Sequence, residues 1–182
     1  MTKWSSADTY VVIIIEGDKW LKRSIHCFVG FAFGVLVSGS QYSLIPFASI
    51  MGFLGGWMPD LDLRMGHRKT LHNIFTAFFF SIMLYMSLLI LNNELKVGIK
   101  QTAIFYIVFS FFGGYILHLL GDMITPRGVY LLYPIVNYRF RVASLKSSST
   151  ITNVLGFLFG SLLLLLWFIG YYHTIEQVIL NR

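Results

Sequence analysis

Charged residues are scarce in this chain of 182 residues, at 12% of the total. Soluble domains contain about 25%, because they must present a hydrated surface. Here 56% of the residues are hydrophobic and the mean hydropathy is +0.70. This composition excludes an ordinary soluble domain and indicates a protein that is surrounded by lipid.

Cysteine is almost absent, with Cys27 alone at the start of an apolar run. One thiol excludes a disulfide framework and CxxC chemistry, and we expect Cys27 to be a buried structural thiol. The net charge of +6 comes from basic residues that lie scattered between apolar runs, without a basic stripe or block. The pattern argues against nucleic acid as a partner and favours anionic membrane lipids.

Three segments are long and apolar enough to cross a bilayer, which takes about 20 residues for about 30 Å of hydrocarbon. They are Leu71–Leu91, Ala103–Leu120 and Ile151–Tyr172. Their few polar residues are mostly of kinds that bond to backbone or to other helices. The sequence predicts an all-α, polytopic membrane protein with about five membrane segments.

The other two of the five expected membrane segments precede these three spans. They lie between Ile25 and Met58 and are short. The chain breaks near Ser38-Gly39-Ser40-Gln41, with Pro46 soon after. Each half has about 14–17 residues, less than a full span requires. Either two short helices cross a locally thinned bilayer, or the pair forms a re-entrant hairpin. Both alternatives return the chain to the face where it began.

The regions outside the spans divide the chain into three parts. Residues 1–24 form an expected interfacial segment with Trp4 and Trp20, because the apolar run Tyr10–Ile15 is too short for a signal peptide. Residues 25–172 form a single transmembrane domain, and 173–182 a short tail. His173 is expected to be an interfacial histidine in that tail.

Basic residues predict the orientation. If the N-terminus is cytoplasmic, the parts of the chain on the outer side of the membrane contain only three basic residues, Lys96, Lys100 and Arg182. The inner segments then have Lys3, Lys19, Lys22, Arg23, Arg64, Arg68, Lys69, Arg127, Arg139, Arg141 and Lys146. The positive-inside rule favours this arrangement in the inner membrane. Gly30-x-x-x-Gly34 and Gly156-x-x-x-Gly160 permit close helix contact, and such faces also allow an oligomer.

Ionisable side chains at membrane depth are costly unless they have partners, so they invite a functional explanation. The predicted topology gathers seven of them at the cytoplasmic end, although only Lys and Arg set that topology. His118 and Asp122 are four residues apart and share one helical face. The full set is His26, Asp60, Asp62, His67, His72, His118 and Asp122.

These residues predict a divalent metal site. Asp and His together suit Zn²⁺, Mn²⁺ or Fe²⁺ better than Ca²⁺, which prefers oxygen ligands. Seven candidates exceed the three or four that one open catalytic site needs, so two ions or one ion with supporting residues both remain open. Each pair also has a simpler explanation: Asp60-x-Asp62 as a helix-ending turn, and His118 with Asp122 as a hydrogen-bonded pair. Together these explanations require several coincidences at one membrane face.

The ordered motifs resemble those of the predicted membrane-bound metal-dependent hydrolases, also described as LexA-regulated inner-membrane hydrolases. The early His26 also matches the pattern, and the resemblance covers about residues 26–134. The matching stretches are Gly56-Trp57-Met58-Pro59-Asp60-Leu61-Asp62, His67-Arg68-Lys69-Thr70-Leu71-His72, His118-Leu119-Leu120-Gly121-Asp122, Thr125-Pro126-Arg127-Gly128-Val129 and Leu131-Leu132-Tyr133-Pro134.

The resemblance implies a hydrolase with a bound divalent metal, and it does not specify a substrate. Some positions depart from the family pattern. Leu63 replaces a frequent His and thereby removes one ligand for a second ion, while Lys69, Leu71 and Asn73 replace Gly, Thr and Ser. Lipid phosphatases of the vanadium-haloperoxidase type also have an HxxxD pattern. They are excluded because residues 111–117, directly before His118, contain no Arg or Lys, and no Pro-Ser-Gly-His motif occurs.

The predicted function is metal-dependent hydrolysis at the headgroup level, on a phosphoester of a lipid or lipid-linked substrate. Arg68 is the predicted catalytic residue that holds the anionic group, with Arg127 or Lys69 as further candidates. Two rivals are a metal-ion or proton transporter and a metal-stapled structural protein. A transporter needs polar residues along a path at mid-membrane, whereas the span centres here contain only Ser, Thr, Tyr and Gly as their polar or small residues.

Overall fold

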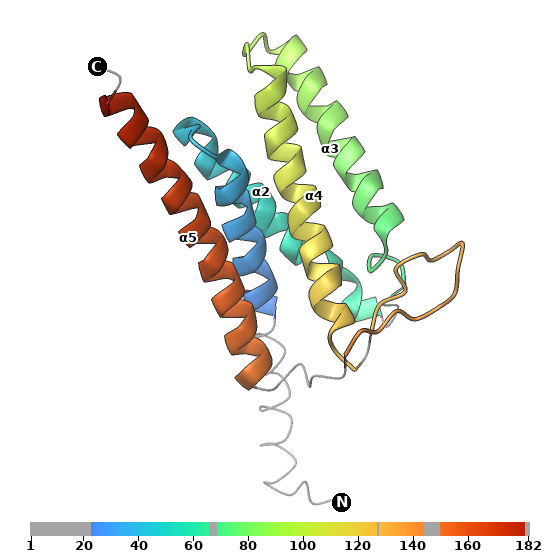
Figure 1. Cartoon of the computed structure of the whole chain (residues 1–182). Coiled ribbons are helices and arrows are strands. Elements are labelled where there is room, and N and C mark those ends of the chain that lie inside the picture. The colour runs from blue at the N-terminus through green and yellow to red at the C-terminus, as the bar shows by residue number, and fades with distance from the viewer. Residues whose placement is uncertain (1–22, 66–68, 127, 144–149, 181–182) are drawn as a thin grey trace, which may run out of the picture.

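The computed structural model describes residues 23–65, 69–126, 128–143 and 150–180 (Figure 1). In this part of the chain the secondary structure is helical, with one isolated β-bridge and no strand. The all-α fold is therefore confirmed, and four helical stretches are long and apolar enough to cross a membrane. The predicted interfacial segment lies outside the described residues, except for Arg23 and Ser24.

An antiparallel hairpin begins the described chain. Its first arm is the N-terminal helix Arg23–Ser38. After a turn at Gly39 come η1 (Tyr42–Leu44), α2 (Ile45–Trp57) and η2 (Met58–Met65), with Pro46 in the first turn of α2. The arms approach to backbone contact at Gly30 with Gly52 and at Gly34 with Ala48. The first predicted glycine pair therefore does serve helix contact, within one chain.

The hairpin is deep. Trp167 donates a hydrogen bond from Nε1 to the Gly39 carbonyl at the hairpin tip, 2.8 Å away. Trp167 lies about 26 Å along its helix from Thr150, at about 1.5 Å rise per residue. That depth is close to the hydrocarbon thickness of about 30 Å, which favours two short crossing helices over a shallow re-entrant loop.

Two long helices follow and pack against each other. They are α3 (Ile74–Glu94) and α4 (Gln101–Met123), joined by a short connection at one end of the molecule. The span predicted from Leu71 begins instead at Ile74, because Asn73 caps the helix by accepting a hydrogen bond from the Thr76 N–H. Figure 1 shows α4 in the middle of the molecule, between α3 and the hairpin.

Helix α4 forms the core with α2. Added side-chain atoms at Gly55 or Gly114 would collide with backbone of the facing helix, at Phe111 and Gly52 respectively. This close approach buries Phe111, Tyr115 and Leu119 with Ala77 and Val129. The central position of α4 is what places the ends of several other segments around its last turns.

The last helix, α5 (Thr150–Leu180), lies on the outer side of the N-terminal helix. It contacts that helix at Gly156, against Ile25, and at Gly160, against Phe28. The predicted span ended at Tyr172, but the helix continues through the expected tail to Leu180, since that stretch contains neither Gly nor Pro. The predicted oligomer through small-residue faces stays a prediction.

Candidate metal centre

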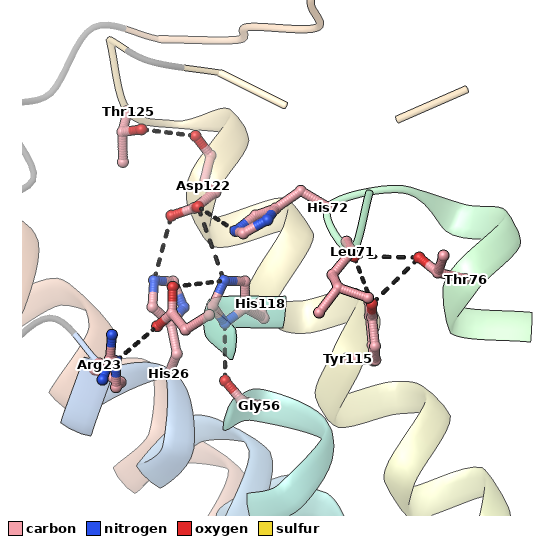
Figure 2. Close-up of polar contacts among 11 residues, drawn as sticks. Arg23, His26, Gly56, Leu71, His72, Thr76, Tyr115, His118, Asp122 and Thr125 are labelled. Carbon is pink, nitrogen blue, oxygen red and sulfur yellow. Dashed lines mark hydrogen bonds and ion pairs between the residues drawn. The ribbon is translucent and has the colours of Figure 1, made fainter. Parts of the chain in front are cut away.

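Five of the seven predicted metal ligands meet at one end of the bundle, as Figure 2 shows around His118. Four separate segments deliver them. His26 lies in the first turn of the N-terminal helix, Asp60 in η2, and His72 just before α3, while His118 and Asp122 are in the last two turns of α4.

Asp122 is the carboxylate that all three histidines approach. Its Oδ1 lies 3.5 Å from His26 Nε2, and its Oδ2 lies 3.6 Å from His72 Nε2 and 3.8 Å from His118 Nε2. Asp60 approaches from the other side, with Oδ1 3.8 Å from His118 Nε2. The rings of His26 and His118 are 4.2 Å apart between centroids. His118, His72 and Asp122 are buried, at 1%, 2% and 3% exposure.

His118 is oriented by a backbone carbonyl. Its Nδ1 lies 2.8 Å from the Gly56 carbonyl oxygen. A carbonyl only accepts, so Nδ1 has the proton, and in the neutral ring Nε2 then presents its lone pair to the two carboxylates. No described residue makes a hydrogen bond with this buried Nε2. A lone pair facing two carboxylates at the end of a buried helix is unfavourable unless a cation or a proton lies between them.

The distances between the imidazoles and the carboxylates are longer than those of a hydrogen-bond network. Hydrogen bonds between nitrogen and oxygen span about 2.7–3.2 Å, but the four contacts between imidazole and carboxylate are 3.5–3.8 Å long. Two ligand atoms that each lie about 2.1 Å from one ion at a tetrahedral angle are about 3.4 Å apart. The donor set therefore has the spacing and the chemistry of a site for a divalent transition metal.

The described residues offer two overlapping groups of donors. One is His26, His118 and Asp122, and the other is Asp60, His72 and His118, with the donor atoms of each group within 4.8 Å of one another. Both groups include His118, whose Nε2 has one lone pair and whose Nδ1 is held by Gly56. One imidazole nitrogen serves one ion, so an ion held through His118 Nε2 would use one of these two groups of three donors.

A hydrogen-bond network fixes the loop that presents His72. The Tyr115 hydroxyl donates to the Leu71 carbonyl and lies 3.2 Å from Thr76 Oγ1. The buried Asn73 amide donates to the carbonyls of Lys69 and Thr70, at 2.9 and 2.8 Å. These contacts hold the backbone on both sides of His72. Outer contacts of this kind orient metal ligands, so Asn73, which departs from the family pattern, has a structural role here.

Arg23 was missed as a site residue. Its Nε lies 3.4 Å from Asp60 Oδ2, whereas His118 Nε2 lies near Oδ1 of the same carboxylate. In the sequence, Arg23 is one of the basic residues that predict the orientation. The available signal was its spacing, because Arg23 is three residues before His26 and therefore on the same helical face.

The remaining predicted residues are placed as follows. Asp62 belongs to η2, but its side chain lies outside the described part of the structure. His67, Arg68 and Arg127 also lie outside it. Their predicted roles, including the catalytic role of Arg68, stay predictions.

Lys69 binds the loop after α4 instead of the cluster. Its Nζ lies 3.2 Å from Asn137 Oδ1 and 4.7 Å from the centre of the Tyr130 ring.

Arg139 donates a hydrogen bond to the Tyr130 hydroxyl at 2.9 Å, which lowers the pKa of Tyr130 below its ordinary value. This loop is closed by paired backbone hydrogen bonds between Val129 and Phe140, and it is tied to α3 by the Ile74 N–H to Leu131 carbonyl bond.

Fold and cluster together define a polytopic helical membrane protein with a buried histidine–aspartate cluster at one end. The sequence profile of the YdjM inner membrane protein family matches residues 21–180. The chain belongs to this family and is a multi-pass inner membrane protein. No curated protein and no solved structure matches it significantly.

Proposed function

We propose that this protein is a divalent-metal-dependent hydrolase that acts at the headgroup level of the inner membrane on a phosphoester of a lipid or lipid-linked substrate. The observation that supports the proposal is the spacing around His118. Three imidazoles and two carboxylates converge there at distances too long for hydrogen bonds and suited to a shared ion. Zn²⁺, Mn²⁺ or Fe²⁺ suits this donor set best.

A bound ion would supply an activated water and polarise the scissile ester. The chain's own residues do the rest. The Gly56 carbonyl fixes the His118 ring, and the Tyr115 and Asn73 contacts hold the His72 loop. Burial of His72, His118 and Asp122 keeps bulk water from competing for the ligands.

Arg23 is the described basic residue nearest the proposed centre, through its contact with Asp60. A guanidinium has five N–H donors in a rigid fork, so it can bind a carboxylate and an anionic phosphoryl oxygen together. We therefore add Arg23 to Arg68 as a residue that would hold the anionic part of the substrate.

The test is metal content together with hydrolysis. The full chain is purified in detergent, and bound metal per chain is measured for the wild type, Asp60→Ala and His118→Ala. His173→Ala is the matched control, because His173 is an exposed histidine on α5. We expect close to one ion per chain in the wild type and control, and its loss in both site variants, together with hydrolysis of bis(p-nitrophenyl) phosphate.

Other results would overturn the proposal. Wild-type protein without metal, at any supplied divalent ion, would mean that protons alone balance the cluster. Metal that is retained in both site variants would place the ion elsewhere. Ion flux into proteoliposomes without hydrolysis would favour a transporter, and a tightly held ion with neither activity would favour a structural staple.

A further inference from the structure

A cavity of about 370 Å³ lies between the N-terminal helix, α4 and α5. Its size falls within the range of small-molecule sites, about 300–1,000 Å³. Helices α2 and α4 pack backbone against backbone and leave no such space. By contrast, α5 contacts the N-terminal helix through the side chains of Ile25 and Phe28, so the two helices lie further apart. The cavity walls are Ile25, His26, Val29, Leu117, Leu120, Gly121, Ile124, Thr125, Thr152, Asn153, Leu155, Gly156 and Phe159.

The cavity is mostly apolar, and the few polar residues that line it gather at one end. Thr152 and Asn153 lie in the first turn of α5, and Thr125 follows the end of α4, so these groups share the end of the bundle that holds the cluster. Val29, Leu117 and Phe159 lie further along their helices. Thr152 to Phe159 covers about 10 Å of α5, at about 1.5 Å per residue. A lipid has the same division between a polar ester region and an apolar chain.

His26 joins the cavity to the proposed metal centre. It lines the cavity, and its Nε2 lies 3.5 Å from Asp122 Oδ1. Gly121 lies against the same ring, and a Cβ there would come within 2.6 Å of His26 Cε1. A molecule in the cavity would therefore have its polar end beside the imidazole that faces Asp122.

The cavity can be reached sideways from the membrane. Four residues line the cavity and are also exposed on the apolar surface, at 40–52% exposure. They are Leu120 on α4, Ile124 directly after it, and Leu155 and Phe159 on α5. In a bilayer these side chains face lipid, so a chain enters between α4 and α5 without leaving the hydrocarbon.

We propose that this cavity binds one acyl chain of a glycerophospholipid and so places the phosphoester of that lipid at the metal centre. The inference rests on the proposed function for the identity of the reacting group. It adds the substrate class, a membrane glycerophospholipid, and the path by which the lipid reaches the cluster, between α4 and α5.

The experiment labels the cavity directly. The full chain is placed in nanodiscs with phosphatidylglycerol that has a diazirine near the middle of one acyl chain. Irradiation is followed by mass spectrometry of the cross-linked residues. Leu155→Trp fills the cavity, and Leu158→Trp is the matched control, since Leu158 is equally exposed on α5 but does not line the cavity.

We expect cross-links on Leu120, Leu155 and Phe159 that excess unlabelled lipid removes. They should be lost in Leu155→Trp and retained in Leu158→Trp, with bound metal unchanged in both variants. Two results would overturn the inference. One is labelling spread evenly over the exposed faces of α3 and α5. The other is labelling on Phe31 and Phe53, which line a second hollow beside Arg23.

Failure of this inference is distinguishable from failure of the proposed hydrolysis. Specific labelling without metal or hydrolysis would support the acyl-chain site and reject the enzyme. Metal and hydrolysis of bis(p-nitrophenyl) phosphate without specific labelling would support the enzyme and reject this substrate path. If both hold, Leu155→Trp should lose far more hydrolysis of the phospholipid than of the small phosphoester, whereas Leu158→Trp should keep both.

Discussion

Helices α4 and α5 are both long and apolar, but 61% of the span residues of α4 are buried against 11% for α5. Both contain glycines that contact a neighbouring helix. The difference lies in what opposes them, because Gly114 meets the backbone of α2 at Gly52, whereas Gly156 and Gly160 meet side chains of the N-terminal helix. Contact between backbones makes a tight core around α4, and contact with side chains leaves a cavity beside α5.

The largest effect should come from the tight contact. In Gly55→Ala the new Cβ would collide with the backbone carbonyl of Phe111, and neither helix can move away without opening the core. We expect a loss of about 3 kcal/mol of folding stability, the upper end of the overpacking range. Thermal unfolding in detergent measures it.

The control for this prediction is Gly170→Ala on α5, where a Cβ would meet no atom within 4 Å. Alanine also favours a helix over glycine by about 1 kcal/mol, so this variant should be as stable as the wild type or more so. Equal losses in the two variants would remove the proposed distinction between α4 and α5.

A smaller effect is expected where a glycine of α4 meets a side chain. Gly121→Ala would displace the His26 ring, since its Cβ would lie 2.6 Å from Cε1. The ring can rotate away, so the fold should persist while affinity for the metal falls by about 10-fold. Gly160→Ala is the control, because it displaces the Phe28 ring, away from the cluster. Unchanged affinity in Gly121→Ala would argue against His26 as a ligand.

A still smaller effect on stability is expected from the hydrogen-bond network that holds His72. Tyr115→Phe removes the hydroxyl that donates to the Leu71 carbonyl and contacts Thr76. We expect a loss of about 1 kcal/mol in stability, as for one hydrogen bond with a neutral partner. Tyr85→Phe on α3 removes an exposed bond from Gln101 and should change little. A thermal shift that is the same in both variants would contradict a special role for Tyr115.

The smallest effect concerns the loop outside the bundle. The hydrogen bond from Arg139 lowers the pKa of Tyr130, so this phenol should ionise below its ordinary value of 10.0. The loop contact should therefore strengthen as the pH rises through the lowered pKa, and should reach full strength above 10.0. Ultraviolet titration of tyrosinate measures the shift.

Arg139→Gln should move that titration to higher pH. Arg141→Gln is the control, since Arg141 is not among the groups that shift the pKa of Tyr130. A titration that stays the same in Arg139→Gln would mean that the hydrogen bond does not persist in solution.

Much of the fold was predictable because long apolar segments follow directly from bilayer thickness. The predicted spans at Ala103–Leu120 and Ile151–Tyr172 fall within α4 and α5. The start of α3 was predicted three residues early, because the capping role of Asn73 depends on a local hydrogen bond that hydropathy does not reveal. The span predicted to end at Tyr172 agrees with the apolar stretch Thr150–Thr174, and α5 continues beyond that stretch to Leu180.

The candidate site was predictable as a set and not as an arrangement. Spacing alone put His118 and Asp122 on one face, and topology put His26, Asp60 and His72 at the same end. Which donors come close enough to share an ion depends on how four segments, far apart in the sequence, pack against one another. The contact of Arg23 with Asp60 and that of His118 with Gly56 arise in the same way, so neither residue pair had a signal of its own in the hydropathy pattern.

The sequence by itself determined that this chain is an all-helical membrane protein, because few charges and long apolar runs permit no other solvent than lipid. It also determined the identity of the polar residues that lie at one end. Only the tertiary structure decided that His118 is their centre, that Arg23 joins them, and that a cavity leads to them from α5. These arrangements depend on how closely the helix backbones approach one another. The size of the residue that faces each glycine sets that distance.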